Sequence, residues 1–324
     1  MSDSEGPALK PPSVVVNWLK GDPAELRAHQ WMEWDGVWDG LDAAFLGIPF
    51  DGASPVRTGS RGGPRGVRER LCYYSVYSVE DDRSMKDFRV ADVGDVDVAV
   101  SDLQGSFDNI KATTKWLTER GIKLAMIGGD HSIAFPILSG ICEAMPEKKI
   151  GIIQFDADHD VRESHFGAVS SGVPFRWLLD AYPEQIRGEN LVQLGIADFR
   201  NHPKHTKFVK DHGVTVISNI AIWRDGIRSA IDRAIEVASR DTDAIYISVD
   251  MDGIDRTAAP GVAAPQAFGI DGRDAAMAIR EFAQHPKTIG IDLNEIAPVL
   301  DSNEATTDLG ALLTMNFLYG LANQ

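Results

Sequence analysis

The 324-residue sequence is poor in cysteine, in positive charge and in long apolar runs. Its two cysteines, Cys72 and Cys142, give no disulfide framework and no CxxC pair, which favours a reducing, cytoplasmic location. No apolar run reaches the length of a membrane span, and the polar start MSDSEGPALKPPS lacks the features of a secretory signal. Lys and Arg number 32 against 48 Asp and Glu, so we expect neither nucleic acid nor a membrane as a partner, because both bind basic surfaces.

Short apolar runs alternate with helix-like segments along most of the chain. The runs are continuous rather than alternating, as is typical of strands buried on both faces, and lie at 43–50, 123–129, 150–157, 191–196, 214–218, 244–250 and 288–295. Helical patterns cover 106–121, 230–241 and 271–285, and Gly121 is placed to end the first of them. This order predicts an α/β fold with a mainly parallel sheet and helices on both faces.

No repeat or linker divides the body of the chain, so we expect a single catalytic domain over residues 41–324. The first forty residues precede the first predicted strand and are rich in tryptophan, at Trp18, Trp31, Trp34 and Trp38. We expect residues 1–40 to form an arm that packs on the body or on a neighbouring subunit.

Charged side chains follow four of the predicted strands, where ligands collect in parallel sheets. They are Asp130 and His131, then Asp156 to Asp160, then Asp250 and Asp252, then Asp292 and Glu295. One acidic strand end is often only a helix cap, but four at one sheet edge repel one another unless cations hold them. The pattern therefore predicts a metal site.

The stretch DADHD, Asp156 to Asp160, raises the question of which residues face the metal. On an extended backbone, Asp156, Asp158 and Asp160 point one way and His159 the other. With His131, Asp250 and Asp252 this makes five carboxylates and one imidazole, a set that suits manganese and is large enough for two ions. Such a pair of ions activates water near neutral pH. We expect His159 and His165 to lie beside the site without binding metal.

Several motifs in order resemble the ureohydrolases, which include arginase, agmatinase and formimidoylglutamase. They run from GIPFDGASPVRTGSRGGPRGVRE through GDVDV, GGDHSIAFP, DADHDVRE, SVDMDGIDRTAAPGV and GIDLNEIAPVLD to EATTDLGALL. The resemblance implies the arginase-type three-layer α/β sandwich, a dinuclear manganese site and a cytosolic homotrimer or homohexamer. It also implies hydrolysis of a C–N bond in a small cationic guanidine or amidine, with release of urea or ammonia.

Carried over residue by residue, the resemblance assigns the metal ligands. One ion is held by His131, Asp156, Asp160 and Asp250, and the other by Asp156, Asp158, Asp250 and Asp252. Glu295 corresponds to the glutamate that binds the cationic group of the substrate, which suits a carboxylate facing a planar cation. We expect Asp160 to act as the proton shuttle.

The chain departs from the family at two positions. The family pattern is Asp-Ala-His-x-Asp, whereas here Asp158 takes the place of the histidine, so five aspartates exceed the four charges of two ions. We expect the excess to raise the pKa of the bridging water. Ser171 stands where arginase and agmatinase have a histidine, which is nearer the formimidoylglutamase branch and makes Arg176 a candidate for binding a substrate carboxylate.

Simpler roles remain open for several of these residues. Ser171 could be a helix cap, and Arg176 could pair with a structural acid. The glycine-rich stretch 59–66 lacks the ending of a phosphate-binding loop, so we expect turns there. We expect Asp255 and Asp301 to order loops. The altered residue Asp158 also leaves a second hypothesis, in which the chain is a non-catalytic subunit of a ureohydrolase hetero-oligomer.

Overall fold

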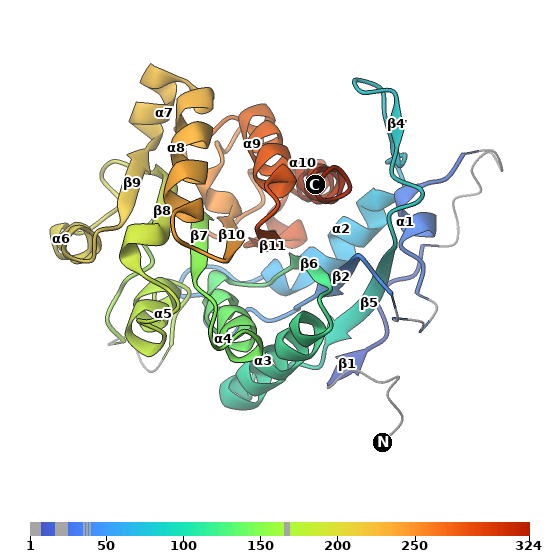
Figure 1. Ribbon diagram of the computed structural model, residues 1–324, viewed down its shortest axis with the longest axis horizontal. Helices are drawn as coiled ribbons and strands as arrows, with labels where there is room; N and C mark the ends of the chain where they lie inside the picture. Colours follow the sequence, from blue (N-terminus) through green and yellow to red (C-terminus); the bar gives the residue numbers. More distant parts are fainter. Residues whose placement is uncertain (1–7, 17–24, 35, 37, 39, 165–168) are drawn as a thin grey trace.

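A nine-stranded sheet runs through the centre of the molecule between two layers of helices (Figure 1). The computed structural model describes residues 8–16, 25–34, 36, 38, 40–164 and 169–324. The strands lie in the order β1 (Leu9–Lys10), β5 (Val90–Val96), β2 (Ala43–Gly47), β6 (Lys123–Ile127), β11 (Thr288–Asn294), β10 (Ala244–Asp250), β7 (Ile150–Phe155), β8 (Leu191–Ile196) and β9 (Thr215–Ser218). β1 runs antiparallel to β5, and all other neighbours in this sheet are parallel.

Helices cover both faces of this sheet. One layer contains α2 (Gly63–Leu71), α8 (Ile227–Ser239), α9 (Gly272–Gln284) and α10 (Ala305–Leu321), and the other contains α3 (Leu103–Glu119), α4 (Ala134–Ala144), α5 (Pro174–Ala181) and α6 (Pro203–Asp211). Shorter elements are α1 (Ala28–Trp31), α7 (Asn219–Asp225) and a hairpin of β3 (Tyr77–Ser78) and β4 (Arg83–Ser84). No helix in the described ranges is long and apolar enough to cross a bilayer.

Alternate residues of the central strands belong to different cores, which explains the continuous apolar runs. In β10, Ile245 and Ile247 pack under one helical layer, whereas Ala244 and Tyr246 pack under the other. Because both faces are buried, every position of the strand is apolar or hydrogen-bonded inside the protein. The predicted three-layer α/β sandwich is confirmed.

The sequence patterns located seven strands and three helices, and two of the elements that they missed are important for the argument. All seven predicted strands are present, and Gly121 follows α3 with a φ of 72°, as expected for the residue after a helix end. The strand β5 was missed because Asp92, Gly94 and Asp95 interrupt its apolar pattern. The expectation of turns at 59–66 was wrong in its second half, where α2 begins with Pro64 in its first turn.

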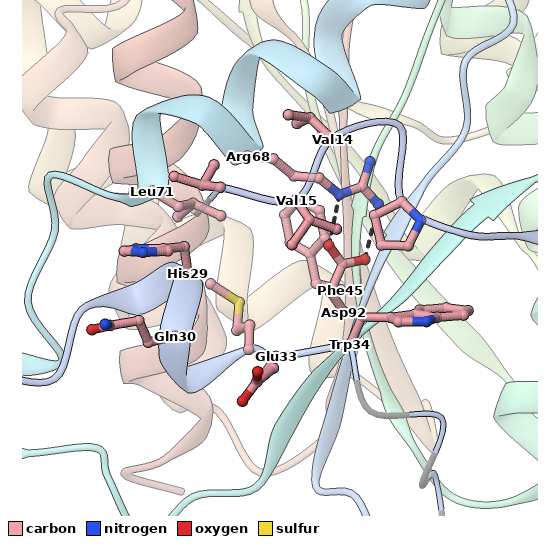
Figure 2. A pocket seen from close by; sticks show the side chains of 13 residues that line it. Val14, Val15, His29, Gln30, Glu33, Trp34, Phe45, Arg68, Leu71 and Asp92 are labelled. Atoms are coloured by element: carbon pink, nitrogen blue, oxygen red, sulfur yellow. Dashed lines mark hydrogen bonds and ion pairs between the residues drawn. The ribbon is translucent and has the colours of Figure 1, made fainter. Parts of the chain in front are cut away.

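Arg68 of α2 accounts for the acids in β5. Its buried guanidinium forms two hydrogen bonds with Asp92, at 2.7 and 2.9 Å, and one with Asp95 at 2.6 Å. It also lies 5.1 Å from the centre of the Phe45 ring. Arg68, Asp92 and Phe45 lie at the wall of a cavity of about 400 Å³ (Figure 2), which His29, Met32 and other residues of the first forty also line.

The described parts of the first forty residues contact the body of the same chain. β1 pairs with β5, and the backbone N–H of Ser13 donates to Asp95 at 3.0 Å. The indole of Trp31 donates to the Phe88 carbonyl at 3.1 Å. The ring of Trp38 packs edge-on against Trp116 with centroids 5.6 Å apart. Trp18 lies outside the described residues, and the domain boundary at residue 40 stays a prediction.

Candidate metal centre

The polar strand ends singled out in the sequence meet at one edge of the sheet. Strands β6, β11, β10 and β7 are consecutive neighbours and run parallel, so their carboxyl ends lie side by side. His131 follows β6, Glu295 follows β11, Asp250 ends β10, and Asp156 follows β7. This topology brings together residues that are up to 164 positions apart, as in the contact between His131 and Glu295.

Four buried side chains form the first candidate ligand group: His131, Asp156, Asp160 and Asp250. Carboxylate oxygens of the three aspartates lie 3.2, 2.9 and 3.5 Å from Nδ1 of His131. Nevertheless, this nitrogen has no hydrogen-bond partner among the described residues. An unpartnered buried nitrogen facing three carboxylates fits a divalent cation, which would take a lone pair from each.

A chain of hydrogen bonds behind His131 determines which of its ring nitrogens carries the proton. Tyr246 and Ser248 donate to the buried carboxylate of Asp292, at 2.6 and 2.8 Å. The Ser248 hydroxyl has therefore used its proton, and its oxygen accepts from Nε2 of His131 at 3.0 Å. With Nε2 protonated, the neutral imidazole presents the lone pair of Nδ1 to the carboxylates. Asp292 is thus a supporting residue and not a member of the ligand groups.

The carboxyl groups of the centre are buried close together, so their charged forms need a positive charge nearby. Burial raises the pKa of Asp156, Asp252 and Glu295 well above their ordinary values, and repulsion from neighbouring carboxylates adds to the rise. Burial also raises the pKa of Asp160 to about 6, although the His131 side chain opposes this. Burial lowers the pKa of His131, but the carboxylates of Asp156 and Asp160 close to Nδ1 raise it well above its ordinary value, so a positive charge is favoured at this position.

A second candidate ligand group consists of Asp156, Asp158 and Asp252. Asp156 therefore belongs to both groups, as expected for a carboxylate that bridges two ions. Asp250, which the resemblance also assigns to both ions, belongs only to the first of these groups. Its Oδ1 instead accepts a hydrogen bond of 2.8 Å from the backbone of Asp252. A role for Asp250 in holding both ions stays a prediction.

Asp158 faces the other acids and His159 faces away. Nδ1 of His159 lies 2.6 Å from the Gln193 side-chain oxygen, and Nε2 lies 3.2 Å from the Thr206 hydroxyl. The orientation agrees with the expectation, but the argument from strand alternation does not apply. β7 ends at Phe155, and the backbone leaves the extended region by Asp160, whose φ is 52°. His165 lies outside the described residues.

Arg200 is a member of the site that the sequence patterns did not reveal. Its Nη2 donates to Oδ2 of Asp158 at 2.6 Å and to Oδ2 of Asp252 at 2.8 Å. It follows β8, the neighbour of β7, so the same rule of strand ends could have found it. The expectation of one excess negative charge at Asp158 did not take this cation into account. Five aspartates are balanced by two divalent ions together with Arg200.

Both candidate catalytic residues have backbone conformations that L-residues rarely adopt. The φ angles are 52° for Asp160 and 64° for Glu295. The Glu295 backbone is held by a 2.8 Å hydrogen bond to the Gly129 carbonyl, and its Oε1 accepts from the backbone N–H of His131 at 3.2 Å. Its buried Oε2 has no partner within the part of the chain that the structure describes. That oxygen is available to a ligand with N–H donors.

A cavity of about 650 Å³ opens beside these acids. Ser171 lines it, and because the N-cap of α5 is Val173, a helix-cap role for Ser171 is wrong. Arg176 is not among the described residues that line it: this guanidinium stacks 4.5 Å from the Phe208 ring centre and lies 3.7 Å from Glu163. This position does not support the predicted role of Arg176 in binding a substrate carboxylate.

Arginines other than Arg176 line the same cavity, namely Arg162 and Arg200. The cavity therefore combines positive groups with the buried acids. Asp255 and Asp301 lie outside its lining. Asp255 accepts hydrogen bonds from Thr257 in the loop after β10, as expected for a residue that orders a loop. Asp301 accepts from the backbone N–H groups of Thr306 and Thr307 in the first turn of α10, so it orders the start of a helix.

Comparison with known proteins matches the arginase family model to residues 41–320. Formimidoylglutamase of Halalkalibacterium halodurans is 36% identical over 288 residues, which cover 87% of this chain and 89% of that protein. Mitochondrial agmatinase of Gallus gallus is 32% identical over 283 residues, which cover 86% and 81%. The crystal structure of formimidoylglutamase from Bacillus subtilis has a TM-score of 0.87 at 31% identity and covers 94% of both chains. The residues matched by the family model include strands β2 to β11 and all the strand ends described above.

Proposed function

Because the chain belongs to the arginase family, and is thus a metal-dependent hydrolase of C–N bonds in linear amidines, we propose that it hydrolyses a formimidoyl amino acid. The observation that carries this choice is the pairing of charges in one cavity: the buried Glu295 carboxylate lines it together with Arg162. A formimidoyl amino acid carries an amidinium and a carboxylate, so it complements both. The first relatives named above act on such a compound by their names, which supports the proposal.

Glu295 binds the amidinium. This planar cation presents N–H groups along two edges, and the free Oε2 of Glu295 accepts one of them. The Glu295 side chain is only 4% exposed, so the charge pair is poorly screened by water. The hydrogen bond from His131 to Oε1 fixes the direction of the carboxylate. The carbon that reacts is thereby held beside the aspartates.

Two divalent ions complete the centre in this proposal, one in each ligand group, with Asp156 shared. The donors are carboxylate oxygens and one imidazole, which favours manganese over softer ions. Such ions, when bound, lower the pKa of water and polarise the group under attack. We propose that Asp160, whose carboxylate lies in the first ligand group at 2.9 Å from Nδ1 of His131, accepts and returns the proton.

Arg162 binds the substrate carboxylate, in place of Arg176. An arginine in the lining also disfavours agmatine, because the far end of agmatine is an ammonium group that Arg162 repels. Water adds to the formimidoyl carbon, and the products identify the bond that breaks. Loss of the substituted amine leaves formamide and the free amino acid, whereas loss of ammonia leaves an N-formyl amino acid.

The test compares turnover of formimidoyl amino acids, guanidino acids and agmatine by manganese-loaded protein, with formamide, urea and ammonia measured. We expect formimidoyl amino acids to be preferred. Arg162→Ala should lower kcat/KM for acidic substrates by about 30- to 140-fold, the loss expected for one charge-assisted hydrogen bond of about 2 to 3 kcal/mol. Arg176→Ala is the matched control and should change it less than about twofold. Equal losses for acidic and neutral substrates, or a preference for agmatine, would contradict the proposal.

The hypothesis of a non-catalytic subunit rested on the altered residue Asp158. Arg200 compensates its charge, and each of the remaining predicted metal-binding acids belongs to at least one of the two ligand groups. Purified enzyme should hold about two ions per chain, whereas a non-catalytic subunit should hold none. We also propose a cytoplasmic homotrimer or homohexamer, in keeping with the ureohydrolase resemblance, and light scattering of purified protein measures the subunit number.

A further inference from the structure

We propose that Arg200 is a built-in counter-cation of the second ligand group, so that the two ions bind with unequal affinity and the second binds in competition with the guanidinium. The inference rests on the proposed two-ion centre. It assigns to Asp158 and Arg200 a joint role: together they replace the neutral histidine that the family pattern has at position 158.

The position of Arg200 is set from outside the centre. Its Nη1 donates to the Ala264 carbonyl at 2.9 Å, on the loop that lines the cavity. Its Nη2 is thereby directed at the acids and reaches Oδ2 of Asp158 and Oδ2 of Asp252. Its side chain is 23% exposed, so the charge is partly withdrawn from water. A guanidinium cannot lose its proton at physiological pH, so this positive charge is permanent.

The two ligand groups differ in whether an arginine is already paired with their carboxylates. In the first group, Nδ1 of His131 and three carboxylates face one another, and none of the described arginines or lysines is paired with them. In the second group, one oxygen of Asp158 and one of Asp252 are already engaged by Arg200. An incoming ion must use the other oxygen of each carboxylate or displace Nη2. In both cases it also meets repulsion from the guanidinium.

The charges of Asp158 and Arg200 cancel, which gives a physical reason for the presence of both residues in the centre. An aspartate at position 158 adds one negative charge relative to histidine, and Arg200 restores the balance without a change in the number of ions. A matched substitution of this kind keeps the centre neutral when both ions are bound. It also keeps Asp158 and Asp252 from repelling each other when the second ion is absent.

The experiment measures ion binding directly, independent of turnover. Protein stripped with a chelator is titrated with Mn²⁺ by calorimetry, and bound ions per chain are counted by elemental analysis. We expect a tight and a weak binding step in the unaltered protein. Arg200→Met should strengthen the weak step by about tenfold or more and leave the tight step within about twofold, because only the second group loses a cation.

Further variants identify the steps and separate charge from folding. Arg200→Gln keeps a hydrogen-bond donor without charge and should give the same strengthening, whereas Arg200→Lys should stay near the unaltered protein. Arg162→Met removes a cation that lines the same cavity and should have a much smaller effect. Asp252→Asn should abolish the weak step alone.

The possible failures can be told apart. If the unaltered protein binds two ions but the Arg200 variants leave the second step unchanged or weaken it, the inference is overturned and the proposed function stands. If the unaltered protein binds no ions and hydrolyses no amidine, the proposed function itself fails.

Discussion

Glu295→Gln tests how the centre holds its substrate. The substitution keeps the shape of the side chain, removes the charge that faces the amidinium and replaces one acceptor oxygen with an NH2 donor. Because Glu295 is 4% exposed, the lost pairing is worth about 2 to 4 kcal/mol in the transition state, or roughly a 30- to 700-fold loss of kcat/KM. The ion count should not change, because Glu295 belongs to neither ligand group.

The same substitution should raise the stability of metal-free protein. Burial, followed by repulsion from Asp250 and Asp130, raises the pKa of Glu295 well above its ordinary value of 4.5. A carboxyl group whose pKa is higher when folded costs stability above its unfolded pKa, so the cost is present at pH 7 and disappears below about pH 4.5. The variant should therefore unfold at a higher temperature than the unaltered protein at pH 7, and at nearly the same temperature at pH 4.

Steady-state kinetics, elemental analysis and thermal unfolding together decide the result. Glu304→Gln is the matched control, because Glu304 is two-thirds exposed and pairs with Arg70 on the surface. It should change kcat/KM less than about twofold. A loss below about threefold for Glu295→Gln, or a loss of ions, would refute the assignment of Glu295 to amidinium binding.

Two further predictions concern histidines. His159→Ala should keep about two ions per chain and slow turnover by roughly 10- to 100-fold, because His159 is connected to Asp156 through the side chains of Gln193 and Gln154. Asp158→Ala should lose one ion per chain. Elemental analysis that shows the reverse would contradict this geometry. Burial, aided by Arg162, lowers the pKa of His205 to about 4 from 6.5, so the unfolded chain binds more protons between these values and stability falls as pH drops from about 6.5 to 4. His205→Gln should flatten the thermal midpoint against pH in this window, and an unchanged slope would show that other groups dominate.

The elements that the sequence patterns missed share a physical cause. β5 carries two acids and a glycine, and only the buried Arg68, from a segment 24 residues earlier, makes these acids acceptable inside a sheet. Arg200 and Arg176 look alike in sequence, since each stands close to an apolar stretch. The fold points the first at Asp158 and the second at Phe208, and such a choice depends on contacts between distant segments.

The side chain of His159 points away from the acids, as expected, but the alternation of side chains along a strand is not the cause. The alternation of side chains holds for an extended strand, but β7 ends at Phe155. What turns His159 away is the polar pocket offered by Gln193 and Thr206, on β8 and α6. The left-handed backbone of Asp160 then returns the chain to the side of His131.

The sequence by itself determined the class of fold and the identity of the acids. Continuous apolar runs demand a sheet covered on both faces, and acids placed after several such runs must converge once the strands are parallel. Only the tertiary structure decided the partition of those acids into two groups, the exclusion of His159 and the presence of Arg200 between Asp158 and Asp252. These outcomes depend on distances of a few ångströms between segments far apart in the chain, and no local periodicity encodes such distances.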